Sequence, residues 1–200
     1  IKPHKVGRLM KILSLRLSNL ASIAGEQHID FEQEPLKTAG LIAITGITGA
    51  GKTTLLDAIC LALFDQVPRL QHAEANKKMV DASGEDIQVN STVNSLRRGC
   101  VQGFAEVEFI AQDHKQYLAR WEVKRARLKA NGRIQSVLRT LRCISDDQLI
   151  SEQAKECNKR IIELLGLDFK QFTRTVLLAQ SEVTAFLKAK DNERADLLEY

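Results

Sequence analysis

Apolar and polar residues alternate over Lys11–Leu20, with leucines at every second position. Because successive side chains of a strand point to opposite faces, this period predicts a half-buried strand. Gln27–Phe31 predicts a second short strand after a turn. The continuous apolar run Leu41–Thr45 is typical of a central strand that is covered on both faces. The first part of the chain therefore predicts half-buried strands and one strand that is buried on both faces.

Dense apolar residues over Lys52–Phe64 predict a helix that packs against this sheet. The stretch 67–99 shows no clear period, so we interpret it as a long surface excursion with room for one short helix. Alternation returns over Phe104–Ala111 and Gln116–Leu128, which we expect to be strands.

Asn131-Gly132 is a hairpin turn signal, and it precedes a predicted strand at Ile134–Ile144. Ser151 is a suitable N-cap for a helix over Glu152–Leu165, which Gly166 would end. A short helix near Asp168–Thr173 and a strand at Thr175–Ala179 follow. The element order predicts an α/β fold with a central sheet and an added group of antiparallel strands.

Composition excludes several classes of protein. Hydrophobic residues make up 44% of the 200 residues and charged residues 27%, as in an ordinary globular chain. No apolar run approaches the ~20 residues of a membrane-spanning helix. The four cysteines have neither metal-site spacing nor a disulfide-framework pattern, which favours a cytoplasmic protein.

The motif that carries chemistry lies at residues 46–53, which fit the phosphate-binding pattern G-x-x-x-x-G-K-[ST] between a predicted strand and a predicted helix. Its glycines let backbone N–H groups converge on phosphate oxygens, and the helix N-terminus adds a positive dipole. The alternative is a glycine-rich turn that binds nothing. The candidate nucleotide-binding residues are Gly46, Ile47, Thr48, Gly49, Ala50, Gly51, Lys52, Thr53 and Thr54.

Two side chains of the motif have separate expected roles. The Lys52 ammonium suits the β and γ phosphates, and the Thr53 hydroxyl suits Mg²⁺. Hydrolysis also needs an acidic residue after an apolar strand. None of the predicted strands has a run of four apolar residues that ends in Asp; the nearest candidate, Val107–Asp113, is interrupted by polar residues. Either the other half of the site lies beyond Tyr200 or the protein is not a hydrolase.

Basic residues concentrate between Lys115 and Arg142, where nine cations accompany the single acid Glu122. This segment carries +8, and the remaining 172 residues sum to −4. A hairpin of that charge is a candidate track for a nucleic-acid backbone, and the alternative is a solvated hairpin. The candidate DNA-binding residues are Arg120, Lys124, Arg125, Arg127, Lys129 and Arg133.

Three stretches of the chain resemble the N-terminal ATPase segment of the SbcC family. They are Met10–Phe31, the phosphate loop with the following TTLLDAI, and Thr173–Leu198. These proteins are the large subunits of bacterial SbcCD nucleases and are related to SMC proteins and ABC ATPases. This chain departs from the family pattern at Ser181 and Val183, beside the family's Q-loop glutamine. It also has Ala21 where related archaeal and eukaryotic proteins have an arginine near the nucleotide.

The resemblance implies a site that uses ATP and Mg²⁺. The family's Q-loop glutamine reaches Mg²⁺ and the attacking water, and Gln180 is the matching position. By the resemblance, Lys52 and Gln180 act in catalysis, and Thr53 and Gln180 hold the metal. The implied partners are the nuclease subunit SbcD, double-stranded DNA, a second copy of the head and the chain's own C-terminal ATPase lobe.

The resemblance also implies a domain organisation. Residues 1–9 precede the first strand-like segment and are interpreted from the sequence itself as a leader outside the fold. By the resemblance, residues 10–189 would be an N-terminal ATPase lobe that forms half of a split head, and 190–200 the start of a coiled-coil helix. Such a lobe would belong to a DNA-repair ATPase that regulates a partner nuclease on DNA ends and hairpins, and it would be inactive alone.

Three other functions stay open at this point. One is a coiled-coil ATPase of the SMC or RecN kind that has no nuclease partner. Another is a nucleotide- or DNA-binding module without activity of its own. The third is a small-molecule kinase or GTPase, which would need an acidic metal ligand or a base-specificity motif that this chain does not show.

Overall fold

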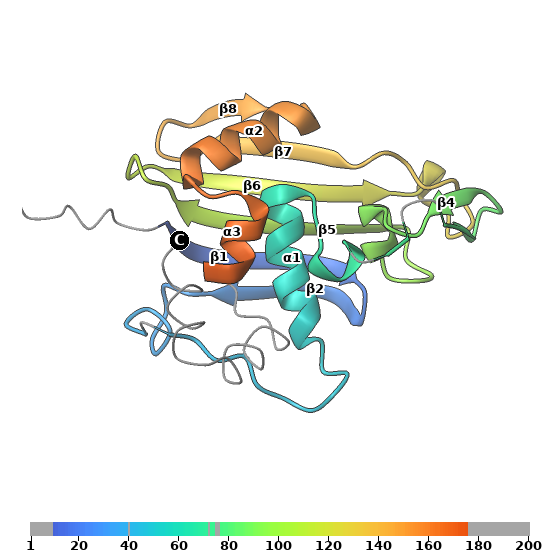
Figure 1. Ribbon diagram of the computed structural model, residues 1–200, viewed down its shortest axis with the longest axis horizontal. Helices are drawn as coiled ribbons and strands as arrows, with labels where there is room; N and C mark the ends of the chain where they lie inside the picture. Colours follow the sequence, from blue (N-terminus) through green and yellow to red (C-terminus); the bar gives the residue numbers. More distant parts are fainter. Residues whose placement is uncertain (1–9, 40, 72, 75–76, 176–200) are drawn as a thin grey trace, which may run out of the picture. The chain divides into compact units, whose positions relative to one another are not determined.

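A six-stranded antiparallel sheet organises the first part of the chain (Figure 1). The computed structural model describes residues 10–39, 41–71, 73–74 and 77–175. The strand order in the sheet is β2-β1-β5-β6-β7-β8. The strands are β1 (Lys11–Leu20), β2 (Ile23–Asp30), β5 (Gln102–Ile110), β6 (Gln116–Lys124), β7 (Leu138–Cys143) and β8 (Gln148–Ser151).

The alternation predicted for β1 is confirmed, with the predicted bounds. Leu15 and Leu17 are almost fully buried, and Leu15 lies opposite Val107 of β5. Burial of every second residue continues across β5 and β6, so one face of the sheet forms the core. The hydrophobic effect thus fixes the register, because a slip of one residue would expose this whole set.

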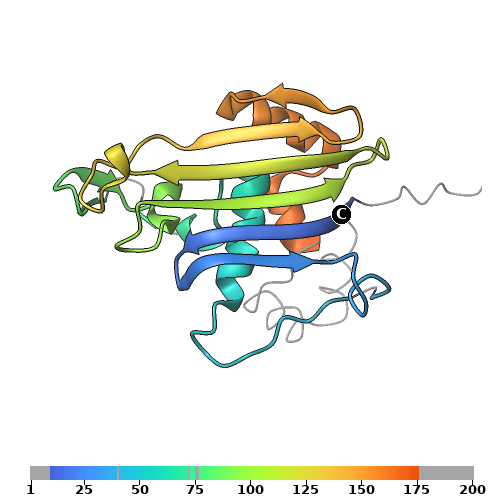
Figure 2. The same cartoon turned by 180° about the vertical axis from the view of Figure 1, so that it is seen from behind.

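Two helices, α1 (Lys52–Phe64) and α2 (Ala154–Leu165), cover that face, and Figure 2 shows the opposite face free of helices. We call this opposite side the outer face. The predicted bounds of α1 are confirmed. Its residues from Asp57 to Phe64 are all buried, so this helix is the centre of the core.

The surface excursion at 67–99 holds more structure than predicted. It contains two short 3₁₀ helices, Pro68–Leu70 and Thr92–Ser95, and a separate two-stranded sheet of β3 (Lys78–Val80) and β4 (Asp86–Gln88). Strands of three residues are too short to show a period in the sequence.

The predicted central strand Leu41–Thr45 is wrong for the described chain. The segment forms no strand, and Leu41 is 85% exposed and Ile44 41% exposed. An extended segment becomes a strand when neighbours bond its backbone N–H and C=O groups. None of the described strands pairs with this segment, so its apolar side chains remain uncovered.

Two further predictions from local sequence, the hairpin turn at Asn131-Gly132 and the N-cap at Ser151, are wrong. Strand β6 ends at Lys124 and β7 begins only at Leu138, so the connection around Asn131-Gly132 is wider than a two-residue hairpin and contains a 3₁₀ turn, Ala126–Leu128. Ser151 is not the N-cap of α2, because it belongs to β8, a strand that the sequence did not predict. Gly166 ends α2 with φ +66°, as expected of a left-handed C-cap.

Residues from Leu167 onward form a second unit. Its described part contains α3 (Phe169–Thr175), which confirms the short helix expected there. Asp168 and Gln171 exchange side-chain and backbone hydrogen bonds of 2.8 and 2.9 Å, a capping box at the helix start. Gln180, the expected strand beyond Thr175 and the expected helix at 191–200 lie outside the described residues. No described helix is long and apolar enough to cross a membrane.

Candidate nucleotide-binding site

The phosphate loop, residues 46–51, leads directly into α1. Gly51 is the N-cap of α1 and has φ +91°, which favours glycine. A Cβ atom at this position would lie 3.0 Å from Cγ1 of Ile23, so any larger residue would also crowd this side chain. Leu55 N donates the first helical hydrogen bond to the Gly51 oxygen, and the preceding N–H groups remain available at the helix start.

The Lys52 side chain folds over this loop. Its Nζ donates to the carbonyl oxygens of Gly46 and Ile47, at 2.7 and 2.8 Å. The first turn of α1 contains no acidic residue that would compete with an anion. An ammonium group and a helix N-terminus therefore lie together, and both favour a phosphate group.

The two threonines after Lys52 differ in accessibility. Thr53 is exposed, so its hydroxyl is free to bind a metal ion held by a nucleotide. Thr54 is buried, and its hydroxyl shares a 3.0 Å hydrogen bond with Ser22, so only its backbone N–H remains for a phosphate. Among the described residues, no group of three or more His, Cys, Asp or Glu side chains could hold a metal by itself.

A buried carboxylate lies further along α1. Asp57 is 3% exposed, and the Arg69 guanidinium lies 3.0 Å from its Oδ2. Burial raises the pKa of Asp57 to about 6, because desolvation penalises the carboxylate more than Arg69 stabilises it. This group titrates close to neutral pH.

The far end of α1 is fixed by polar contacts. Arg139, which is 2% exposed, donates from β7 to the carbonyl oxygens of Leu61 and Leu63. Asp65, the C-cap residue, accepts a 2.7 Å hydrogen bond from Trp121 Nε1. This role of Arg139 was not predicted from the sequence, although strand alternation places it in phase with the buried Leu141.

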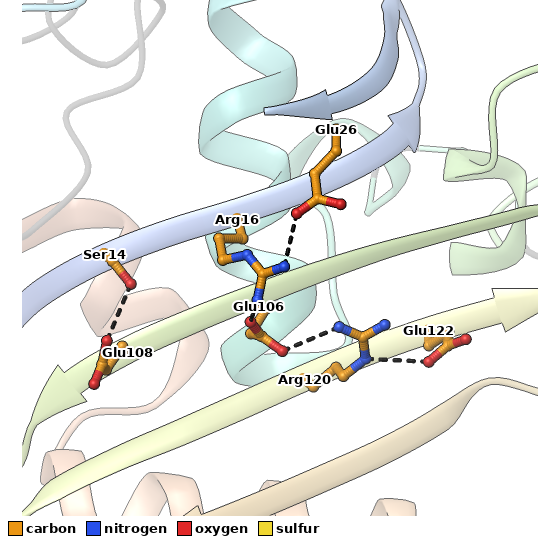
Figure 3. A network of polar contacts seen from close by, with 7 residues as sticks. All are labelled: Ser14, Arg16, Glu26, Glu106, Glu108, Arg120 and Glu122. Atoms are coloured by element: carbon orange, nitrogen blue, oxygen red, sulfur yellow. Dashed lines mark hydrogen bonds and ion pairs between the residues drawn. The ribbon is translucent and has the colours of Figure 1, made fainter. Parts of the chain in front are cut away.

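On the outer face, cations are paired with acids (Figure 3). Arg120 forms ion pairs with Glu106 and Glu122, at 3.0 and 3.1 Å. Glu106 also pairs with Arg16 at 2.9 Å, and Glu122 with Lys124 at 2.6 Å. The structure thus shows a charge-compensated network here rather than a continuous basic track.

The remaining cations of the candidate DNA-binding set fall into two groups. Arg125 is 7% exposed and binds both carboxylate oxygens of Asp81 at 2.7 Å, so its guanidinium is occupied. Arg133 is exposed and pairs with Glu85 at 2.9 Å. Arg127 and Lys129 are exposed and have no acidic partner among the described residues. The structure does not bring all six side chains to one surface.

Comparison with known protein families identifies the family of this chain. The model of the AAA domain family matches residues 14–199, and the chain belongs to this family. The matched residues include the loop at residues 46–53, and the predicted α/β phosphate-loop fold is confirmed.

Curated relatives confirm the more specific resemblance. The SbcC subunit of nuclease SbcCD from Pseudomonas aeruginosa is 53% identical over 95% of this chain and 16% of that protein. The SbcC subunit from Rhodobacter capsulatus is 46% identical over 95% of this chain and 15% of its own. A probable DNA double-strand break repair Rad50 ATPase of Aquifex aeolicus is 30% identical over 94% of this chain and 16% of its own. The chain thus spans about one sixth of these relatives.

Among solved structures, the recombination mediator protein RecF in its ATP form matches with a TM-score of 0.46. The sequence identity is 15%, over 74% of this chain and 30% of the RecF chain.

Proposed function

We propose that the chain is the ATP-binding lobe of a DNA-repair ATPase that regulates a partner nuclease acting on double-stranded DNA ends and hairpins. The observation that carries this proposal is the position of Lys52 over the phosphate loop at the N-terminus of α1, in a chain that is 53% identical to an SbcC protein. Loop geometry supports ATP binding, and the relatives' names support the biological process.

The lobe is half of a split head in this proposal, with residues 10–189 completed by a C-terminal lobe of the same protein. The uncovered apolar segment Leu41–Thr45 supports this, because it leads into the phosphate loop and pairs with none of the described strands. Strands of the second lobe would satisfy its backbone and bury its side chains. The lobe alone would bind nucleotide poorly and would not hydrolyse it.

Magnesium belongs to the same proposal. Mg²⁺ prefers oxygen ligands and usually retains several waters besides substrate phosphates. The exposed Thr53 hydroxyl fits that role. Gln180, outside the described residues, would supply a second oxygen and orient water, and Lys52 would hold the phosphates. When bound, the metal would neutralise charge on the phosphates.

Two further partners follow from the relatives. A second head would close on the bound ATP, and the nuclease subunit, SbcD in the resembled complex, would act when the heads close. Four cysteines that are free in the structure suit action in the cytoplasm.

DNA contact would be carried by the exposed cations of the β6–β7 connection. Arg127 and Lys129 are free to meet phosphates, whereas Arg120, Lys124 and Arg133 would have to leave acidic partners. Arg125 is buried against Asp81 and would hold the connection in place rather than touch DNA. Each phosphate contact would contribute roughly −0.9 to the log–log salt slope of binding.

The test uses the full-length protein with its nuclease subunit and a hairpin-capped DNA duplex. ATP should stimulate cleavage by the wild type and should not stimulate cleavage by the Lys52→Ala variant. Lys115→Ala is the matched control, because Lys115 is an exposed lysine that pairs with Asp146. ATP-stimulated cleavage by Lys52→Ala would contradict the proposal. ATP hydrolysis without any effect on cleavage would favour an SMC-like ATPase without a nuclease partner.

The uncovered segment Leu41–Thr45 is also compatible with the alternative function, a nucleotide- or DNA-binding module without activity of its own. A separate binding measurement distinguishes this alternative from the split-head proposal. If the 200-residue chain alone binds Mg-ATP as tightly as the full-length protein does, the second lobe adds nothing to binding. The split-head proposal predicts much weaker binding by the chain alone.

A further inference from the structure

The turn between β1 and β2 lies against the start of the phosphate-binding helix. Ser22 Oγ is 3.0 Å from Thr54 Oγ1, and a Cβ atom on Gly51 would lie 3.0 Å from Ile23 Cγ1. Side chains of this turn therefore contact both the N-cap and the first turn of α1. If the turn moved, the backbone N–H groups at the helix start would lose this support.

The backbone of this turn has an uncommon conformation. Asn19 and Ala21 have φ values of +53° and +43°, in the left-handed region that residues other than glycine rarely adopt. Such a conformation persists only where surrounding contacts determine it. The segment Ser95–Arg97, more than 70 residues later, makes those contacts.

Arg97 makes three of the hydrogen bonds that hold the turn. Its Nη1 donates to the carbonyl oxygens of Ala21 and Ser22, at 3.0 and 2.9 Å. Its backbone N donates to the Asn19 oxygen at 2.9 Å, and Ala21 N donates to the Ser95 oxygen at 2.8 Å. One guanidinium thus links two consecutive carbonyl groups directly before the residue that contacts the phosphate loop.

We propose that Arg97 is a positioning residue of the nucleotide site. It acts through the carbonyl groups of Ala21 and Ser22, which hold the Ser22 hydroxyl against Thr54, and it does not touch the nucleotide. This inference rests on the proposed ATP binding and adds a residue that supports it. Arginine suits the position because its fixed, planar donors serve two acceptors at once, which a flexible, strongly hydrated lysine does less well.

The expected consequence is a loss of affinity rather than of chemistry. Without the Arg97 guanidinium, the two carbonyl groups would turn toward water and the left-handed turn would relax away from Gly51 and Thr54. The N–H groups that cradle phosphate would then be less well ordered before binding, and the nucleotide would have to order them. Groups that act on the bound phosphate would be unchanged, so the KM should rise while kcat stays nearly constant.

The neighbouring residue supplies a matched control. Arg98 is exposed, and its side chain makes no polar contact among the described residues. Arg97→Gln and Arg98→Gln remove the same charge from adjacent positions, so a general electrostatic effect would appear in both. Ser22→Ala removes the link to Thr54 without touching Arg97, and the double variant tests whether the two residues act along one path.

The experiment measures Mg-ATP affinity with a fluorescent ATP analogue, together with kcat and KM, on the full-length protein. Arg97→Gln should raise Kd and KM about tenfold with kcat within about twofold, and Arg98→Gln should match the wild type. Ser22→Ala should also weaken binding, and the double variant should lose less than the product of the two single effects. Unchanged affinity in Arg97→Gln, or an equal loss in Arg98→Gln, would overturn the proposal.

Two further measurements make the result decisive. The thermal midpoint without nucleotide shows whether Arg97→Gln is folded; if it is not, Arg97→Lys replaces it and should give a smaller rise in KM at constant kcat. A proportional fall in kcat with unchanged KM would overturn the proposal in either variant. Absence of Mg-ATP binding by the wild type would instead refute the proposed function itself.

Discussion

Arg139 Nη2 donates to the Leu63 carbonyl oxygen at 3.1 Å, although the two residues are 76 positions apart. This buried contact ties β7 to the last turn of the helix that begins at the phosphate loop. A cation at a helix C-terminus meets the negative end of the helix dipole and bonds carbonyl groups that lack partners in the helix. The core thus holds α1 at the end opposite the proposed nucleotide site.

Arg139→Met should loosen the last turn of α1. Losing the guanidinium leaves the carbonyl oxygens of Leu61 and Leu63 without this donor, which should lower the free energy of opening this turn by about 3 kcal/mol. Hydrogen exchange of the α1 amides in the full-length protein should accelerate roughly 100-fold. Arg142→Met is the control, because Arg142 lies on the same strand but is exposed and pairs with Asp147. Equal exchange rates in the two variants would contradict this role.

Asp57 should make stability depend on pH. Its pKa of about 6 in the native state lies above the usual unfolded value of about 3.9, so the native state binds the proton more tightly. The resulting stabilisation, about 3 kcal/mol at most, is fully present below pH ~4 and is lost as the pH rises through 6.

Asp57→Asn should therefore flatten the stability profile between about pH 4 and 6, measured by the urea midpoint of the full-length protein. Asp86→Asn, at an exposed carboxylate, should keep the wild-type slope. A wild-type profile that rises with pH over this range, or an unchanged slope in Asp57→Asn, would show that Asp57 does not carry the effect.

Glu106 should be the central residue of the outer-face network. It is buried and bridges Arg16 and Arg120, and the Arg120 guanidinium also lies 4.1 Å from the centre of the Phe104 ring. Glu106→Gln would leave two cations facing one neutral group, and we expect the free energy of unfolding to fall by about 2 kcal/mol. Glu32→Gln, in an exposed pair with Lys11, should cost less than 1 kcal/mol, as is common for surface pairs. Thermal unfolding of both variants checks the difference.

DNA binding should depend on unpaired cations. Replacing both Arg127 and Lys129 with Gln should make the log–log salt slope of duplex binding less steep by about 1.8, because two phosphate contacts are lost. Arg120→Gln should change the slope much less, since Arg120 is held by Glu106 and Glu122. Fluorescence anisotropy over a range of salt concentrations measures the slopes. A larger change of slope in Arg120→Gln than in the Arg127 and Lys129 double variant would place the DNA on the outer face.

Local patterns predicted the parts of the fold that depend on local physics. The bounds of β1 and α1 follow from the alternation of leucines and from dense apolar residues next to a glycine N-cap. The phosphate loop stays a prediction from its motif, whose residue types are dictated by backbone conformation and by contact with phosphate. These features need no knowledge of distant residues.

The sequence could not show which distant groups pair. Arg125 meets Asp81 across 44 positions, and Arg139 meets Leu61 across 78. Both arginines lie in the segment that carries +8, and a count of charge does not show which cations already have partners in the fold; Arg125 was therefore included among the candidate DNA-binding residues. Leu41–Thr45 was predicted as a strand from its own residues, whereas strand formation also needs neighbours.

The most direct test of the account is equilibrium binding of Mg-ATP to the full-length protein and to its Lys52→Ala variant, with Lys115→Ala as control. Loss of the Lys52 ammonium should abolish measurable binding, because it removes the positive charge that lies over the phosphate loop. The control should bind like the wild type. If Lys52→Ala bound Mg-ATP with wild-type affinity, residues 46–53 would not be the nucleotide site and the account would be wrong.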